Sequence, residues 1–71
     1  MTQEVLIVDG MSCDACVRHV TNALKNVPGV ESAEVKLTEG KAFVNFDPSL
    51  ANVAALVEAI EEEGYSARLA G

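Results

Sequence analysis

The sequence predicts an α+β fold of the ferredoxin-like type, a sandwich in which two helices cover one face of a four-stranded antiparallel sheet. Two observations predict it. Hydrophobic residues recur at every second position in some segments and about every 3.6 positions in others, in the order strand, helix, strand, and this order occurs twice. The two halves are of nearly equal length and are joined by a hairpin signal around Gly40.

The first half begins with a strand and continues with a helix. Residues 4–9 (EVLIVD) form a short apolar run rich in β-branched residues, which predicts a buried or central strand. Pro28-Gly29 cannot continue a helix, so we expect the helix after this strand to end there. The apolar stripe of that helix consists of Val17, Val20, Leu24 and Val27.

Two alternating segments then predict a pair of antiparallel strands. Residues 32–37 and 42–47 each place apolar side chains at every second position. The connection between them, Thr38-Glu39-Gly40-Lys41, contains a glycine for the positive φ angle that a tight turn needs. We therefore expect a hairpin.

The second helix and the last strand complete the second half. Asp47-Pro48-Ser49 is a helix-start signal, with a side-chain oxygen for the free amides and a proline where its missing N–H costs nothing. Gly64 ends the helix, and residues 65–69 alternate as a final strand. The apolar stripe of the helix consists of Val53, Leu56, Val57 and Ile60.

The composition is that of one globular domain spanning residues 1–71. Hydrophobic residues make up 49% of the chain and charged residues 23%, a balance typical of chains that fold. No segment contains an apolar run near the ~20 residues needed to span a bilayer, so we expect no membrane insertion. The N-terminus also lacks the basic start and long apolar region of a secretory signal, which favours a cytoplasmic location.

The charge balance limits the classes of partner. Eleven acidic residues against five basic ones give a net charge of −6, which argues against binding to nucleic acid or to an anionic membrane surface. RNA-binding modules of the same topology also need basic charge and aromatic residues on the open face of the sheet. We therefore expect the partners to be proteins with basic patches.

Both cysteines of the chain lie between the first predicted strand and the first predicted helix. Cys13 and Cys16 occur in the stretch GMSCDAC at residues 10–16, with Cys16 expected in the first helical turn. Side chains three positions apart at a helix start face the same way, roughly 5–6 Å apart at their Cβ atoms. The helix N-terminus also favours a thiolate over a thiol. The sequence thus predicts a partly exposed dithiolate.

The ion that suits this dithiolate depends on the other ligands nearby. Thiolates select soft ions such as Cu(I), whereas structural zinc sites want four ligands in a tetrahedron. His19 is the only histidine, and we expect it on the polar surface of the helix or, as an alternative, as a third ligand. Asp14 would either complement the helix dipole or act as a hard oxygen ligand that helps to bind zinc.

Three further residues are expected to lie around the thiols. Met11 is interpreted as an anchor that fills a gap beneath the loop, although its thioether is also a possible copper ligand. Ser12 directly precedes Cys13. Tyr65 follows Gly64 at the start of the last strand. We expect its side chain either to pack in the core or to donate a hydrogen bond to a cysteine sulfur.

Other uses of two cysteines fit the sequence less well. A disulfide across so short a loop stabilises little, and a reducing compartment disfavours it. Thioredoxin-like oxidoreductases place CxxC at a helix start, but with an aromatic residue before the first cysteine, where this chain has Ser12. Iron–sulfur clusters need about four cysteines.

The whole chain resembles the heavy-metal-associated domain family, and within it the bacterial copper chaperones. GMSCDAC is similar to the family's GMxCxxC loop, VPGV at 27–30 to its helix-to-strand junction, and AIEEEGY at 59–65 to the end of its second helix. The resemblance implies a carrier, not an enzyme, that binds one Cu(I) per monomer through Cys13 and Cys16, with Met11 supporting the loop and Tyr65 close by. It also implies transfer of Cu(I) by ligand exchange to the metal-binding domain of a copper-transporting P-type ATPase.

The resemblance leaves several alternatives open. The chain also looks like the N-terminal metal-binding domain of such an ATPase, although a start at Met1 and an end at Gly71 favour a free-standing protein. A Zn(II) or Hg(II) carrier and a thiol oxidoreductase are further alternatives. Many bacterial copper carriers have a histidine between the cysteines, where this chain has Asp14 and Ala15. We expect a monomer without copper, and a homodimer bridged by copper is possible.

Overall fold

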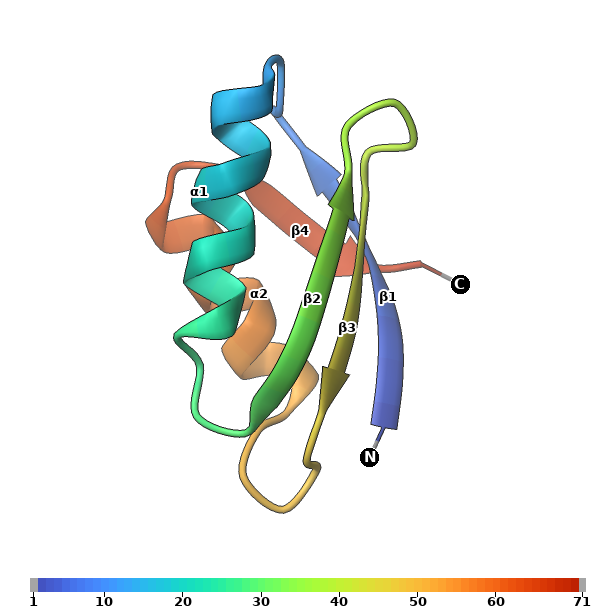
Figure 1. The fold of residues 1–71 in the computed structure, drawn as a ribbon, viewed down its shortest axis with the longest axis vertical. Helices are drawn as coiled ribbons and strands as arrows, with labels where there is room; N and C mark the ends of the chain where they lie inside the picture. The colour runs from blue at the N-terminus through green and yellow to red at the C-terminus, as the bar shows by residue number, and fades with distance from the viewer. Residues whose placement is uncertain (1, 71) are drawn as a thin grey trace.

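The computed structural model describes residues 2–70 and shows the predicted ferredoxin-like fold. Two helices lie on one side of the sheet (Figure 1). The elements are β1 (Thr2–Asp9), α1 (Asp14–Lys25), β2 (Val30–Lys36), β3 (Lys41–Phe46), α2 (Val53–Glu62) and β4 (Ser66–Leu69). Within the described residues, no helix has both the length and the apolar character that crossing a membrane requires.

The sheet has the strand order β2-β3-β1-β4, and every neighbouring pair is antiparallel. The first strand is therefore central, as the apolar run of residues 4–9 predicts. Leu6 of β1 pairs with Ala42 of β3 on one side and with Leu69 of β4 on the other. Asp9 pairs with Ser66, so the end of β1 lies beside the start of β4. This pairing sets the position of the loop that carries the cysteines.

The hydrophobic core lies between the helices and the sheet. On β3, the alternate residues Ala42, Val44 and Phe46 are buried, which confirms the period of two predicted for that strand. The predicted helical stripes also face the core, where their central residues are fully buried. The buried core residues are Leu6, Val8, Val20, Leu24, Ala42, Val44, Phe46, Ala51, Leu56 and Ile60.

The predicted hairpin between the two middle strands is also confirmed. The amide of Gly40 donates to the carbonyl of Leu37 at 3.2 Å, and Gly40 adopts a φ of 63°. A side chain at this position would favour a different backbone conformation, which is why a glycine occurs in this turn.

The prediction that the second helix begins at Asp47-Pro48-Ser49 is wrong. The side chain of Asp47 accepts hydrogen bonds from the amide and hydroxyl of Ser49, at 2.9 and 2.7 Å, and so closes a local turn. The helix begins at Val53 instead, and its N-cap is Asn52, whose side chain accepts a hydrogen bond from the amide of Ala55 at 2.8 Å. The hydrogen bonds from Ser49 hold the pKa of Asp47 below its ordinary value.

The last strand is shorter and more exposed than its alternation suggests. Tyr65 and Ala67 pack against the core, but Leu69, two positions further on, is 48% exposed. Because β4 is an edge strand, it has a neighbouring strand on one side only.

Candidate metal centre

The cysteine loop connects the end of β1 to the start of α1, at the upper end of the molecule in Figure 1. The chain turns at Gly10, which has a φ of 100°. A Cβ atom at Gly10 would lie 3.3 Å from Cδ1 of Tyr65, so the absence of a side chain lets the tyrosine ring lie against the turn. Met11 is half-buried and packs against the hydrophobic core, which ties the start of the loop to the fold.

The two cysteines occupy defined positions at the helix N-terminus. Cys13 is the N-cap residue, with extended backbone, and its carbonyl accepts hydrogen bonds from the amides of Cys16 at 3.0 Å and of Val17 at 3.3 Å. Cys16 therefore lies in the first turn of α1. Both thiols are free, the Cys13 side chain is exposed, and the two sulfurs lie 3.4 Å apart. At this separation, one cysteine can remain a thiol and donate a hydrogen bond to the other cysteine, which is then a thiolate.

Hydrogen bonds stabilise the thiolate form of Cys16. The backbone of Ser12 has the largest effect, the Tyr65 hydroxyl the next, and the thiol and backbone of Cys13 follow. Together they lower the pKa of Cys16 from 9.0 to about 6, although burial opposes them. The same hydrogen bond, together with burial and the negative charge of the thiolate, raises the pKa of Tyr65 to about 12. A large fraction of the cysteine pair has therefore lost one proton at neutral pH.

The sequence does not predict the backbone contribution of Ser12. Ser12 lies directly before Cys13, but its effect on Cys16 comes from the main chain and not from the hydroxyl. Every residue except proline carries the same backbone N–H, so the residue type cannot indicate which N–H donates to Cys16.

The two candidate extra ligands do not join the cysteines in one cluster. Asp14 is the first residue of α1 and is exposed, where an acid complements the helix dipole. His19 is exposed on the polar side of α1. Within residues 2–70, no group of three or more His, Cys, Asp and Glu side chains lies in an arrangement that would hold a metal ion. The donor set that the structure brings together is the pair of cysteine sulfurs.

Comparisons with known proteins identify the family of this chain. Residues 5–66 match the model of the heavy-metal-associated domain. The copper chaperone CopZ of Staphylococcus aureus (strain bovine RF122 / ET3-1) is 48% identical over 65 residues, which cover 92% of this chain and 96% of that protein.

Two solved structures are also similar to this chain. A copper binding domain from HMA7, a P-type ATPase, has a TM-score of 0.98 and 39% identity, over 100% of this chain and 96% of the other. The CopZ metallochaperone has a TM-score of 0.91 and 43% identity, over 94% and 100% respectively. The matched family model covers most of the chain, including both cysteines. The chain therefore belongs to the heavy-metal-associated domain family.

Proposed function

We propose that residues 1–71 form one domain that carries Cu(I), bound one ion per monomer by the thiolates of Cys13 and Cys16. The observation that carries this proposal is the pair of sulfurs 3.4 Å apart at a helix N-terminus, one of them with a lowered pKa. Thiolates are the ligands that soft ions such as Cu(I) prefer. The relatives named as copper chaperone and copper binding domain support the same ion.

The small donor set favours Cu(I) over zinc. Structural zinc sites are closed by four ligands, and neither Asp14 nor His19 joins the two sulfurs in the described structure. Cu(I), in contrast, is stable with two thiolates. Met11 would hold the loop against the core, while Tyr65 and the Ser12 backbone would keep Cys16 deprotonated and ready to bind.

The exposure of the site supports a role in transfer. We propose that one thiolate of a partner attacks the bound Cu(I) to give a three-coordinate ion, from which one of the two cysteines leaves. A second partner thiolate then displaces the other cysteine in the same way. The proposed partner is the metal-binding domain of a copper-transporting P-type ATPase, because a domain of this kind shares the fold and could present its own cysteine pair. The protein then acts in the cytoplasm as a carrier and not as an enzyme.

A second candidate is that the chain is itself the N-terminal metal-binding domain of such an ATPase. The similarity to a domain of a P-type ATPase favours it as strongly as the similarity to CopZ favours a separate chaperone. The cysteine chemistry is the same in both cases. Sequencing the encoding gene on both sides of this segment separates them, since an ATPase frame continues into membrane-spanning segments.

An anaerobic competition titration of the reduced protein tests the metal. Cu(I) and Zn(II) are each buffered by a chelator, and the Cys13→Ser and Cys16→Ser variants serve as controls. We expect one Cu(I) per monomer, held far more tightly than zinc and lost in both variants, while circular dichroism shows an unchanged fold. Comparable or tighter zinc binding would refute the copper assignment and bring Asp14 and His19 forward as ligands.

The His19→Ala variant decides whether histidine takes part. Because His19 is exposed and outside the thiol pair, we expect its replacement to change the Cu(I) affinity by less than about tenfold, which corresponds to about 1.4 kcal/mol. Sedimentation with and without copper tests the proposed apo monomer and detects any homodimer bridged by copper. Turnover of a disulfide substrate by the metal-free protein would instead favour a thiol oxidoreductase.

A further inference from the structure

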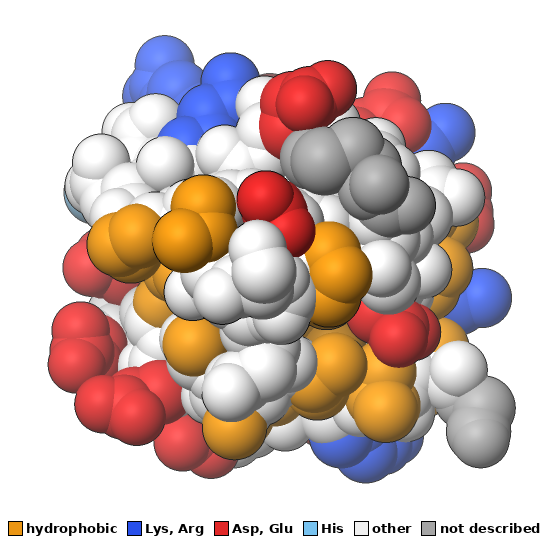
Figure 2. Space-filling view, turned by 90° about the horizontal axis from the view of Figure 1, so that it is seen from below, with side chains coloured by type: hydrophobic (Ala, Val, Ile, Leu, Met, Phe, Trp, Pro, Cys, Tyr) orange, Lys and Arg blue, Asp and Glu red, His pale blue; other side chains and the backbone are white. Residues whose placement is uncertain are grey.

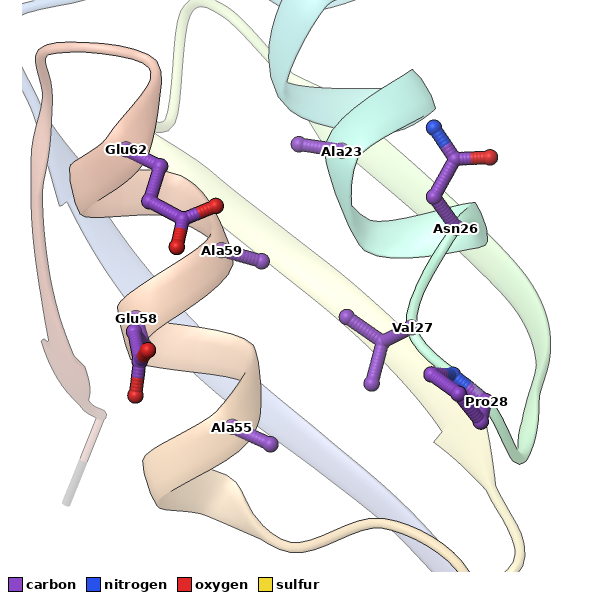
Figure 3. Close-up of a pocket in the computed structure, with 8 residues that line it drawn as sticks. All are labelled: Ala23, Asn26, Val27, Pro28, Ala55, Glu58, Ala59 and Glu62. Carbon is purple, nitrogen blue, oxygen red and sulfur yellow. The ribbon is translucent and has the colours of Figure 1, made fainter.

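A hollow lies between the two helices, on the face of the molecule that the sheet does not cover. Its volume is about 310 Å³, and three alanines are among the residues that line it (Figure 3). Ala23 belongs to α1, and Ala55 and Ala59 lie one turn apart on α2. Leu24 of α1 and Leu56 of α2 are larger and fully buried in the same hydrophobic core. Methyl groups are too short to fill the space above them, so the groove between the helices stays open.

The groove continues into an exposed apolar end of the molecule. Val27 and Pro28 line its lower part, and Gly29 follows at once. A Cβ atom at Gly29 would lie 2.7 Å from Cβ of Leu50, which places Leu50 directly beside this turn. Leu50 is 66% exposed. Figure 2, which views this end, shows hydrophobic side chains gathered there and acidic side chains around them, several of them together at the lower left.

One wall of the groove carries negative charge, and no ion pair within residues 2–70 compensates it. Glu58 and Glu62 line the groove from α2, one turn apart, and both are exposed. No lysine or arginine occurs between Lys41 and Arg68, so α2 has no basic residue. The ion pair found within residues 2–70 joins Arg68 to Asp9, on the sheet. A ligand that fits this wall must therefore be positively charged.

We propose that this groove is a docking site for a basic amphipathic helix of a partner protein. An apolar side chain of that helix would be seated on the three alanines, and lysines or arginines one turn apart on it would pair with Glu58 and Glu62. The net charge of −6 disfavours an anionic membrane as the occupant. Complementary charge makes such a contact selective and speeds its formation.

The groove is separate from the cysteine loop, so both surfaces are available at the same time. Ala23 lies ten residues after Cys13 along α1, which is about 15 Å at the helical rise of 1.5 Å per residue. The loop and the turn at Pro28 lie at opposite ends of α1 (Figure 1). A partner bound in the groove would leave the thiols free, which makes the groove independent of the proposed metal function.

The test uses the reduced full chain and a short amidated peptide whose leucines and lysines follow helical spacing. We expect NMR titration to shift the amides of Ala23, Ala55 and Ala59 and to leave those of the cysteine loop in place. Glu58→Lys with Glu62→Lys should weaken binding by roughly tenfold, because two attractive pairs become repulsive. The matched control, Glu31→Lys with Glu34→Lys, changes the net charge equally at exposed sites on β2 and should retain the affinity.

A second pair of variants tests the shape of the groove without changing its charge. Ala59→Leu fills the hollow and should weaken binding, whereas Ala54→Leu, on the exposed side of α2, should not. Both should keep the circular dichroism spectrum of the parent and its metal affinity, so failure here is distinct from failure of the proposed carrier function.

Several results would overturn the proposal. The proposal fails if the peptide does not bind, or if the two double lysine variants weaken its binding equally. It also fails if the amide shifts in the NMR titration map to the sheet. Binding to phosphatidylglycerol vesicles that depends on the same groove residues would assign the groove to a membrane. Self-association in sedimentation that Ala59→Leu abolishes would assign it to a second copy of the chain.

Discussion

Replacing Tyr65 by phenylalanine tests how the fold sets the acidity of the cysteine pair. The backbone of Ser12, the Tyr65 hydroxyl and the thiol and backbone of Cys13 lower the pKa of Cys16 from 9.0 to about 6, with Tyr65 second in size. Because burial opposes these hydrogen bonds, their combined effect exceeds the net lowering of the pKa, and the loss of the second largest should raise the pKa of Cys16 by about one. The thiolate fraction at pH 7 then falls from about 90% to about 50%.

The assay is the ultraviolet absorbance of the thiolate in the reduced, metal-free protein as the pH is raised under anaerobic conditions. Cys16→Ser gives the baseline for Cys13 alone. The Cys16 proton must leave before the metal binds, so Tyr65→Phe should also weaken metal binding near pH 7. The difference in affinity should vanish at a pH above the Cys16 pKa of both the parent and the variant. An unchanged pKa of Cys16 in Tyr65→Phe would refute the hydrogen bond as a cause.

The same contact predicts a reciprocal effect on the tyrosine. Cys16 raises the pKa of Tyr65 from 10.0 to about 12, first through the hydrogen bond, and its negative charge adds to the effect. Cys16→Ala removes both, so the tyrosinate absorbance should appear at lower pH. A tyrosine pKa that stays near 12 in this variant would exclude Cys16 as a cause of the raised value.

Three further predictions concern stability. Gly29→Ala should lower the free energy of unfolding in urea by more than the ~1 kcal/mol expected for Gly64→Ala. Both glycines have a φ near 95°, but only at Gly29 would the new Cβ atom clash with Leu50. Equal losses in the two variants would exclude the clash. Asn52→Ala should cost about 1 kcal/mol through the lost cap of α2, and a neutral result would contradict that role. Because folding lowers the pKa of Cys16, the unfolded chain binds more protons, so the stability of the reduced metal-free protein should rise with pH from about 6 to 9.0, a slope that Cys16→Ser should remove.

Local patterns were sufficient for the order of the elements, because each period of hydrophobicity is a property of one segment. The alternation on β3 and the helical stripe through Val20 and Leu24 correspond directly to buried faces. The start of α2 was misplaced for a chemical reason. Asp and Asn side chains accept backbone hydrogen bonds both in turns and at helix caps, so the presence of Asp47 does not by itself distinguish a turn from a helix start.

The features of the candidate site also differ in whether they depend on local sequence or on tertiary packing. The spacing of Cys13 and Cys16 brings the sulfurs to one side of a helix start, which the sequence predicts without knowledge of the rest of the fold. The groove between the helices could not be predicted, since Ala23, Ala55 and Ala59 are ordinary helix-forming residues. Their alignment depends on how α1 and α2 pack.

The position of Tyr65 shows why the chemistry of the cysteines depends on strand register. Asp9 pairs with Ser66, so the residue before β4 meets the residue after β1, and the ring of Tyr65 lies against Gly10. A slip of one residue between these strands would turn the tyrosine to the other face of the sheet and remove its hydroxyl from Cys16. The unfolded chain has the same CxxC spacing, but it lacks the contact of the Tyr65 ring with Gly10 and that of the Tyr65 hydroxyl with Cys16. The part of the lowered Cys16 pKa that Tyr65 contributes is therefore a consequence of the pairing of β1 with β4, formed between segments that are far apart in the sequence.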